Sequence, residues 1–328
     1  ELAAVLPAGK ARAEQIKAGK QLVEKVKKDE LAKVAGELDK IGIDWAAPPD
    51  SAKTAKASDL EVKVETSREK DTATAGDPIE LKVTVKNKSQ SPVYRLRAQT
   101  ESESGYFDAK ELVFGKIGPG EEKVAKVELG WCETEGKKYA SIHAGPKDAK
   151  RTCKIPMDAS DRSDGVNIKF EADGGEAPAT AELRPTVKSL PRPVFKYSYQ
   201  IVDDRGGNGD GRLQRGEKVS MYLTVKNTGS GRSYETQAAI TNMSGDGLQL
   251  YAGRFDVSNM KPGEARKVTF TFDVAKDLQD AEAVLSLSVG DRDLNEIARE
   301  KVKIPIESSA QVSAIDEVRE AGQSGAVL

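Results

Sequence analysis

The sequence contains one twelve-residue pattern twice, as GDPIELKVTVKN at residues 76–87 and as GEKVSMYLTVKN at residues 216–227. The two stretches align without a gap, and apolar residues occupy every second position in both. This alternation is typical of a β-strand with one buried face. The repetition indicates two copies of one structural unit.

Other residues extend this repeat. Tyr94 and Tyr234 keep the same spacing from the two stretches, and Pro-Gly-Glu recurs at residues 119–121 and 262–264. Short alternating stretches separated by turn sequences, without intervening helical patterns, indicate antiparallel sandwiches. The sequence therefore predicts a mainly β chain with two tandem immunoglobulin-like antiparallel β-sandwiches. Further strands are expected at residues 60–64, 93–100, 111–114, 124–129, 166–170 and 181–187.

The N-terminal part of the sequence has a helical pattern instead. Within residues 11–41, Val23, Val26, Val34 and Leu38 recur at helical spacing among Lys and Glu residues. This predicts an amphipathic helix that ends near Gly42 and packs on a neighbouring domain. A membrane-surface role is disfavoured because the apolar stripe contains no Phe or Trp.

These patterns divide the chain into four parts. We expect a helical segment and linker at residues 1–57, the first sandwich at 58–190, the second at 191–307 and a flexible tail at 308–328. The prolines at 191 and 193 are expected to form a short hinge between the sandwiches. Glu1 is not an initiator Met, so we expect the numbering to begin inside a longer precursor.

Composition limits the classes of function. The chain has 328 residues with 51 Lys+Arg and 53 Asp+Glu, a formal net charge of −2. This balance argues against a broad basic surface for nucleic acid. No apolar run approaches the roughly 20 residues of a transmembrane helix. No nucleophile elbow or phosphate-binding loop occurs, and the only His, His143, is expected to be a packed or surface residue.

The stretch DDRGGNGDGRLQRGE at residues 203–217 resembles a calcium loop. Its residues at positions three, five, seven and twelve of such a loop are Asn208, Asp210, Arg212 and Glu217, whereas position one is a glycine without a ligand. Asp203 or Asp204 would then have to supply the first ligand. A structural Ca²⁺ site is therefore predicted. The alternative is an acidic, glycine-rich connection neutralised by its arginines, which are Arg205, Arg212 and Arg215.

The only cysteines, Cys132 and Cys153, are separated by 20 residues. An even number of cysteines in a polar, β-rich chain predicts a disulfide formed in an oxidising compartment. The alternative is a pair of reduced, buried thiols.

Four segments together resemble a known family. They are LDKIGIDW at residues 38–45, YRLRA at 94–98, FDAKELVFGKIGPG at 107–120 and YSYQIVDD at 197–204. They resemble the region downstream of the catalytic core in large envelope members of the C-terminal processing (tail-specific) serine peptidases. That family uses a Ser/Lys dyad beside a PDZ domain, and neither pattern occurs in this sequence. The resemblance implies a chain that is not itself an enzyme, within a secreted, periplasmic or cell-envelope precursor whose catalytic domain lies upstream.

Two functions follow from this reading. In the first, the sandwiches are a non-catalytic accessory region that binds a protein or peptide, either the peptidase domain or its substrate, and thereby positions substrates or anchors the enzyme. Exposed strand edges would accept an extended peptide by β-addition. In the second, the chain is an independent cell-envelope structural or adhesion-type protein built of tandem modules.

Overall fold

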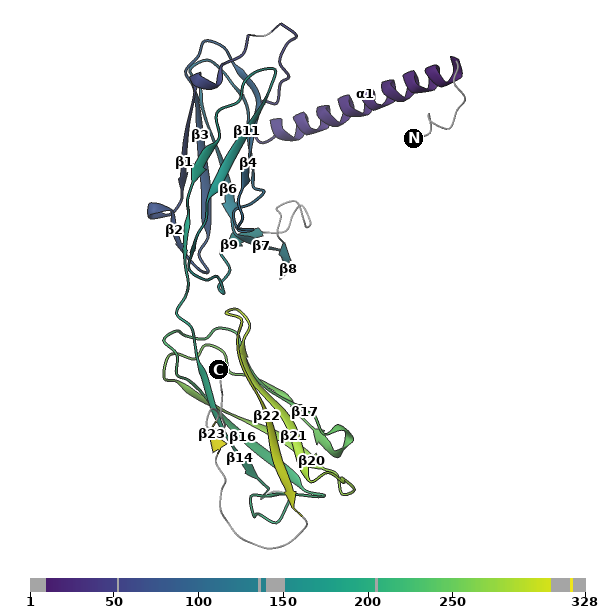
Figure 1. The fold of residues 1–328 in the computed structure, drawn as a ribbon, viewed down its shortest axis with the longest axis vertical. Coiled ribbons are helices and arrows are strands. Elements are labelled where there is room, and N and C mark those ends of the chain that lie inside the picture. Colours follow the sequence, from purple (N-terminus) through teal and green to yellow (C-terminus); the bar gives the residue numbers. More distant parts are fainter. Residues whose placement is uncertain are drawn as a thin grey trace. The chain divides into compact units, whose positions relative to one another are not determined.

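The computed structural model describes residues 10–51, 53–134, 137–139, 151–203, 206–307 and 319–320 (Figure 1). The chain forms two compact units. The first comprises Glu1–Ile155 and Asp161–Lys188, and the second comprises Pro156–Ser160 and Ser189–Leu328. The helix α1 (Lys10–Asp39) precedes the strands, and the predicted mainly β, immunoglobulin-like fold is confirmed.

The first unit is a sandwich of two antiparallel sheets. Their strand orders are β1-β3-β6 and β12-β11-β4-β5. The strands are β1 (Leu60–Thr66), β3 (Ile79–Asn87), β4 (Val93–Glu101), β5 (Glu111–Ile117), β6 (Glu122–Leu129), β11 (Val166–Asp173) and β12 (Ala181–Leu183). Two small sheets complete the unit, formed by β2 (Thr72–Thr74), β10 (Arg162–Ser163) and β13 (Thr186–Lys188), and by β7 (Trp131–Thr134), β8 (Lys137–Tyr139) and β9 (Arg151–Lys154).

The second unit is a sandwich of two five-stranded sheets, with orders β18-β20-β16-β14-β23 and β15-β22-β21-β17-β19. Strand β23 belongs to the predicted C-terminal tail (residues 308–328), of which the structure describes residues 319–320. The strands of the first sheet are β14 (Phe195–Val202), β16 (Lys218–Asn227), β18 (Leu248–Leu250), β20 (Ala265–Val274) and β23 (Arg319–Glu320). Those of the second are β15 (Leu213–Gln214), β17 (Thr236–Asn242), β19 (Arg254–Asp256), β21 (Glu282–Asp291) and β22 (Glu296–Glu307). Short 3-10 helices are η2 (Ala57–Asp59), η3 (Glu69–Asp71) and η4 (Gly245–Gly247).

The repeated stretches form the equivalent strands β3 and β16 in the two sandwiches. Each is flanked on both sides by antiparallel partners, β1 and β6 for β3, and β14 and β20 for β16. Their alternate side chains are fully buried in the two cores because one strand face points inward. The matched buried residues are Leu81, Val83 and Val85 in β3 and Met221, Leu223 and Val225 in β16.

Each repeated strand ends in a fully buried asparagine whose side chain forms hydrogen bonds with two turns. The Nδ2 group of Asn87 donates to the carbonyl oxygens of Ser91 (2.8 Å) and Ile117 (3.2 Å). The Nδ2 group of Asn227 donates in the same way to Gly231 (2.8 Å) and Met260 (3.2 Å). The two units therefore share side-chain contacts as well as strand pattern.

The helix α1 confirms one expectation and corrects another. It ends at Asp39, and the N–H of Gly42 donates to the carbonyl of Asp39 (2.9 Å), as expected for a glycine that terminates a helix. The predicted packing on a neighbouring domain is wrong for the described part of the chain. From residue 13 to residue 39, only Ala35 and Leu38 are partly shielded from solvent, and all other side chains are exposed.

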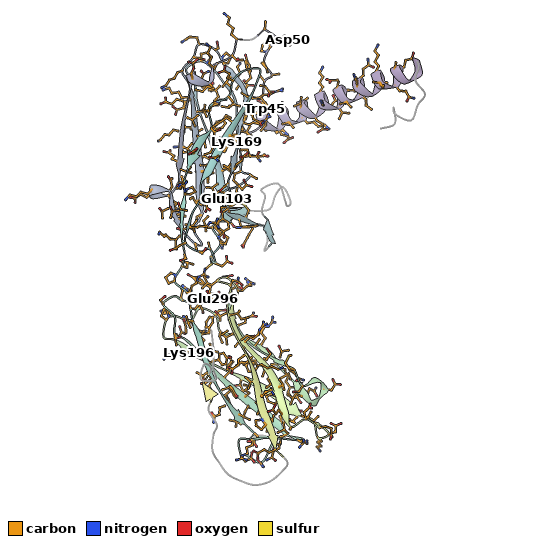
Figure 2. The ribbon with its side chains drawn as sticks, in the orientation of Figure 1. Trp45, Asp50, Glu103, Lys169, Lys196 and Glu296 are labelled. Atoms are coloured by element: carbon orange, nitrogen blue, oxygen red, sulfur yellow. A yellow bond between two sulfur atoms is a disulfide. The ribbon has the colours of Figure 1, made fainter. Side chains whose placement is uncertain are left out.

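The residues that follow α1, before the predicted linker, lie along the first sandwich. The N–H of Lys116 in β5 donates to the carbonyl of Asp44 (2.7 Å), and Arg95 Nε donates to the carbonyl of Trp45 (3.0 Å). Trp45 lies where the chain leaves α1 and meets this sandwich (Figure 2). Gly115 has a φ of +74°, and a Cβ there would stand 2.3 Å from the carbonyl oxygen of Asp44. Glycine at this position therefore lets the segment approach β5 closely.

Candidate functional site

Strand β5 forms an open edge of the first sandwich, because it is the terminal strand of the sheet β12-β11-β4-β5. The segment before the sandwich contacts this edge near its C-terminal end, at Lys116. Of the preceding residues, Leu112 and Phe114 are each 2% exposed and face the core, and Gly115 lies against the segment at Asp44. Val113 is the uncharged residue of this stretch that is partly exposed. Edge strands commonly carry charged residues that discourage pairing with other chains. The part of β5 around Val113 is therefore suited to accept another strand.

The opposite sheet has a different kind of edge. Strand β1 carries Glu61, Lys63 and Glu65 at alternate positions, and each forms an ion pair. The ion pairs are Lys88–Glu61 (2.7 Å), Lys63–Glu65 (2.6 Å) and Lys82–Glu65 (2.6 Å). Such a row of charges protects an edge from strand addition. Of these two edges, β5 is the one better suited to accept another strand.

A shallow hollow of about 230 Å³ lies over β4, β5 and β11 beside this edge. Val113 of β5 lines the hollow, together with two ion pairs that join neighbouring strands. These pairs are Arg97–Glu171 and Lys169–Glu101 (2.6 Å); Lys169 is labelled in Figure 2. The hollow is large enough to receive a side chain of an added strand, and its charged walls favour a polar or charged group.

The predicted calcium loop joins β14 to β16 in the second sandwich and brings three acidic residues together. Asp203, Asp210 and Glu217 are 1%, 3% and 8% exposed. A Cβ at Gly207 would stand 2.7 Å from Asp203 Oδ2 and 2.8 Å from Glu217 Oε1. Glycine at position 207 therefore allows these two carboxylates to converge. Asp204 lies outside the described residues.

Hydrogen bonds hold the loop around these carboxylates. Asp203 accepts hydrogen bonds from the N–H groups of Gly209 and Gly211, both at 3.0 Å. Asp210 accepts from Asn208 Nδ2 (3.0 Å) and from Gln214 Nε2 (2.8 Å). The N–H of Gln214 also donates to Glu217 Oε2 (3.0 Å). The predicted residues Asp203, Asn208, Asp210 and Glu217 thus belong to one network.

The neighbouring carboxylates affect the ionisation of Glu217. Burial, together with the negative charges of Asp203 and Asp210, raises the pKa of the Glu217 carboxyl above its ordinary value, against the opposing effect of the Gln214 N–H. Arg215, one of the three arginines of the loop, donates its side-chain hydrogen bonds to backbone carbonyl oxygens, those of Leu278 (2.6 Å) and Asp280 (3.3 Å).

The alternative to a calcium site was an acidic connection whose negative charge is neutralised by the arginines of the loop. Arg212, a predicted member of the metal site, forms an ion pair with Glu307 (2.6 Å), where both side chains are more than 40% exposed. Arg205 lies outside the described residues. No group of three or more His, Cys, Asp or Glu side chains has an arrangement ready to hold a metal ion in the part of the chain that the structure describes.

The predicted disulfide joins Cys132 of β7 to Cys153 of β9. The two residues lie directly opposite one another in the antiparallel pair β7–β9, and both are buried. The alternative of two reduced thiols is therefore wrong. His143 lies between them in sequence and outside the described residues.

Among the described residues, no helical stretch combines the length and the hydropathy of a membrane span.

Comparison with known proteins identifies one family-level similarity. Residues 207–297 match the CARDB family model. This match covers most of the second sandwich, and CARDB domains are immunoglobulin-like domains found in cell-surface proteins. No curated protein matches the chain.

Solved structures resemble the chain only distantly. A protein of unknown function from Porphyromonas gingivalis W83 has 12% identity and a TM-score of 0.21, covering 77% of this chain and 100% of that protein. Red sea bream transglutaminase has 10% identity and a TM-score of 0.26, covering 76% and 32% of the two chains. Trypsin-activated alpha-2-macroglobulin from Escherichia coli has 10% identity and a TM-score of 0.24, covering 75% and 18%. These scores are too low to support an inference about function.

The CARDB match and the disulfide agree on a coarse assignment. The CARDB match indicates an accessory module of cell-surface or extracellular proteins. Disulfides persist in oxidising compartments, so the Cys132–Cys153 bond fits a location outside the cytoplasm.

Proposed function

We propose that this chain is the non-catalytic accessory region of a secreted or periplasmic C-terminal processing serine peptidase, and that it binds extended protein segments. The uncharged open edge of β5 is the observation that supports this function most directly. The CARDB similarity supports an extracellular accessory module, and the sequence resemblance to the peptidase family supports the kind of enzyme it would serve.

On this proposal, the β5 edge accepts a segment of an unfolded protein as an added strand. Backbone hydrogen bonds supply most of the affinity, and the hollow beside Val113 accepts one side chain. Recognition through the backbone suits a peptidase that must handle many substrate sequences. The chain itself performs no bond cleavage, and the upstream catalytic domain supplies that chemistry.

Binding of a fluorescently labelled unfolded protein to the purified chain tests this mode. Val113→Lys places a charge at the β5 edge and is expected to weaken binding at least about tenfold. Val124→Lys is the matched control, because Val124 is 47% exposed on the edge strand β6 of the opposite sheet. Equal affinities of the two variants, or no saturable binding, would refute the β5 site.

The reading frame upstream of Glu1 tests the association with a peptidase. An in-frame Ser/Lys catalytic domain is the expected result. A frame without such a domain would refute the association and favour the second candidate, a cell-envelope structural or adhesion-type protein of tandem modules. The CARDB similarity is compatible with that second candidate as well.

We also propose that the loop of residues 203–217 binds a structural Ca²⁺ ion. The burial of the Asp203, Asp210 and Glu217 carboxylates in one loop, with Asp203 and Glu217 brought near one another at Gly207, supports this site, because a cation would add to the compensation that the loop's hydrogen bonds supply. Ca²⁺ prefers such oxygen ligands. The ion would stabilise the connection between β14 and β16, with Asn208 as a further oxygen donor and Asp204 and Arg212 as neighbouring loop residues.

Calorimetry with Ca²⁺ and with chelator tests the metal proposal. A ligand present at about 100 times its dissociation constant stabilises a folded unit by about 2.7 kcal/mol. We therefore expect Ca²⁺ to raise the melting temperature of the second unit by several degrees, and Asp210→Asn to abolish the rise. An unchanged melting temperature at millimolar Ca²⁺ would refute the site without affecting the proposal for β5.

A further inference from the structure

The helix α1 exposes several large apolar side chains along its length. It spans 30 residues, about 45 Å at 1.5 Å per residue. Six large apolar side chains along it are 39% to 62% exposed, namely Ile16, Leu22, Val23, Val26, Leu31 and Val34. Surface helices usually bury such residues against a neighbour. An additional partner for α1 would therefore stabilise it.

Several of these side chains form a line along one side of the helix. Residues separated by 7, 11 or 18 positions point in nearly the same direction on an α-helix. Ile16, Val23 and Val34 have these spacings. Val26 and Leu31 lie to either side of the line. The stripe is narrow, as in the contact line between two helices.

Charge along α1 is strongly asymmetric. In the sequence, residues 10–20 contain four basic residues and one acidic residue, whereas residues 29–39 contain four acidic residues and one basic residue. The first turn has no acidic residue and the last turn has no basic residue. This distribution opposes the helix dipole, which favours negative charge at the N-terminus and positive charge at the C-terminus. The asymmetry therefore weakens the isolated helix.

The same asymmetry is self-complementary. When two copies of the helix run antiparallel, the basic third of each faces the acidic third of the other. A register that sets Ile16 opposite the partner's Val34 also sets Lys20 opposite the partner's Glu30. In that register Val23 lies opposite the partner's Lys27 and beside its Val26. The apolar contacts therefore lie at the two Ile16–Val34 positions, and the aliphatic stem of Lys27 covers Val23 between them. A parallel pair would place like charges together at both ends.

We propose that α1 is a dimerisation element, and that it pairs antiparallel with α1 of a second copy of this chain. The dimer buries the apolar stripe and joins the oppositely charged ends. Lys27 is 11 residues after Ile16 and 7 before Val34, so it lies within the apolar line, and Lys20 lies beside it. We therefore expect a reversible, concentration-dependent dimer rather than a permanent one. This inference is independent of the β5 edge and of the Ca²⁺ site.

Charge reversal tests the pairing by analytical ultracentrifugation over a concentration series. Lys20→Glu replaces two attractive contacts with two repulsive ones and is expected to weaken dimerisation about tenfold. The double variant Lys20→Glu/Glu30→Lys exchanges the charges and is expected to restore the wild-type dissociation constant to within about threefold. Circular dichroism of each variant verifies that α1 is still helical. A chain that is monomeric at every concentration, or a double variant no better than Lys20→Glu, would overturn the proposal.

Cross-linking tests the antiparallel direction. Ile16→Cys and Val34→Cys introduce the only free thiols, since Cys132 and Cys153 are joined in a disulfide. A mixture of the two variants is expected to form mixed disulfides under mild oxidation. Ile16→Cys alone is expected to form none through α1, because the two copies of position 16 would lie about 27 Å apart along the pair. Efficient cross-linking of Ile16→Cys with itself would show a parallel pair and refute the proposed direction.

Discussion

Replacement of Asn87 by Ala is expected to destabilise the first sandwich severely. The Asn87 side chain is fully buried, and its Nδ2 group donates to the carbonyls of Ser91, Ile117 and Gly118 at 2.8 to 3.2 Å. Its Oδ1 accepts from the N–H (3.0 Å) and the hydroxyl (2.8 Å) of Ser89. One amide group thus holds the turn after β3 and the turn after β5 together.

The magnitude follows from these contacts. An amide has two N–H donors, so about four hydrogen bonds are lost in total, each worth about 1 kcal/mol. Water can reach the partly exposed groups of the first turn and recover part of this loss. We therefore expect Asn87→Ala to lower the free energy of unfolding of the first unit by about 3 kcal/mol.

The two tryptophans provide a selective assay. Trp45 and Trp131 are the only tryptophans and both belong to the first unit, so tryptophan fluorescence during urea unfolding reports on that unit. A loss of about 3 kcal/mol lowers its urea midpoint by about 1 to 2 M, with a slope of about 2 kcal/mol per M. Asn227→Ala should instead destabilise the second unit, as seen by calorimetry, and leave the fluorescence transition in place.

The control is Asn167→Ala on β11, because Asn167 is exposed and its substitution should change stability by less than about 0.5 kcal/mol. If Asn87→Ala lowered the fluorescence midpoint no more than Asn167→Ala does, the asparagine contacts would contribute little, and the reasoning would be refuted.

Three further predictions concern other contacts. Reduction of the Cys132–Cys153 disulfide should lower the stability of the first unit by about 3 kcal/mol, measured by tryptophan fluorescence with and without reductant; an unchanged midpoint would contradict it. Gly207→Ala should destabilise the second unit by about 2 kcal/mol in calorimetry, because the new methyl group would overlap the Asp203 and Glu217 carboxylates. The control is Gly209→Ala, whose methyl group meets no atom within 4 Å. Since Gly209 has a φ of +78°, this control measures the cost of backbone strain alone. Burial lowers the pKa of Lys110, so in the alkaline range the folded first unit binds fewer protons than the unfolded chain. The stability of this unit should therefore rise as the pH approaches the ordinary lysine pKa of about 10.4. Lys110→Met should remove this rise, measured as the urea midpoint at each pH.

The sequence was sufficient to predict the elements whose pattern is local. The alternation in residues 79–85 and 219–225 fixes which side chains face the core, and the structure buries them. The same holds for the end of α1 near Gly42. A buried strand face and a terminating glycine depend on neighbouring residues only, so these predictions needed no knowledge of distant contacts.

The features that the sequence did not reveal depend on contacts between distant residues. Residues 48–57 have the Pro-rich, polar composition of a linker, yet Ala55 is 3% exposed and its N–H donates to the carbonyl of Pro92 (3.1 Å). The parallel pairing of β2 with β13 joins strands more than 100 residues apart. The sequence also did not predict that β5 is an edge strand. Alternating apolar residues identify a strand, but they do not show which strands are its neighbours in the sheet.

The differences between the two sandwiches indicate where their functions lie. Both keep the same buried strand and the same asparagine, which are the contacts that a sandwich of this kind needs in order to fold. The first adds a disulfide-linked sheet and an N-terminal segment bound along β5, and the second adds a loop with three buried carboxylates. Both units need the buried strand and the asparagine for stability, so residues found in only one copy are candidates either for binding or, like the Cys132–Cys153 disulfide, for stabilising that unit alone. On this argument, substitutions at Val113 should affect peptide binding more than folding, whereas substitutions at Asn87 or Asn227 should affect folding alone.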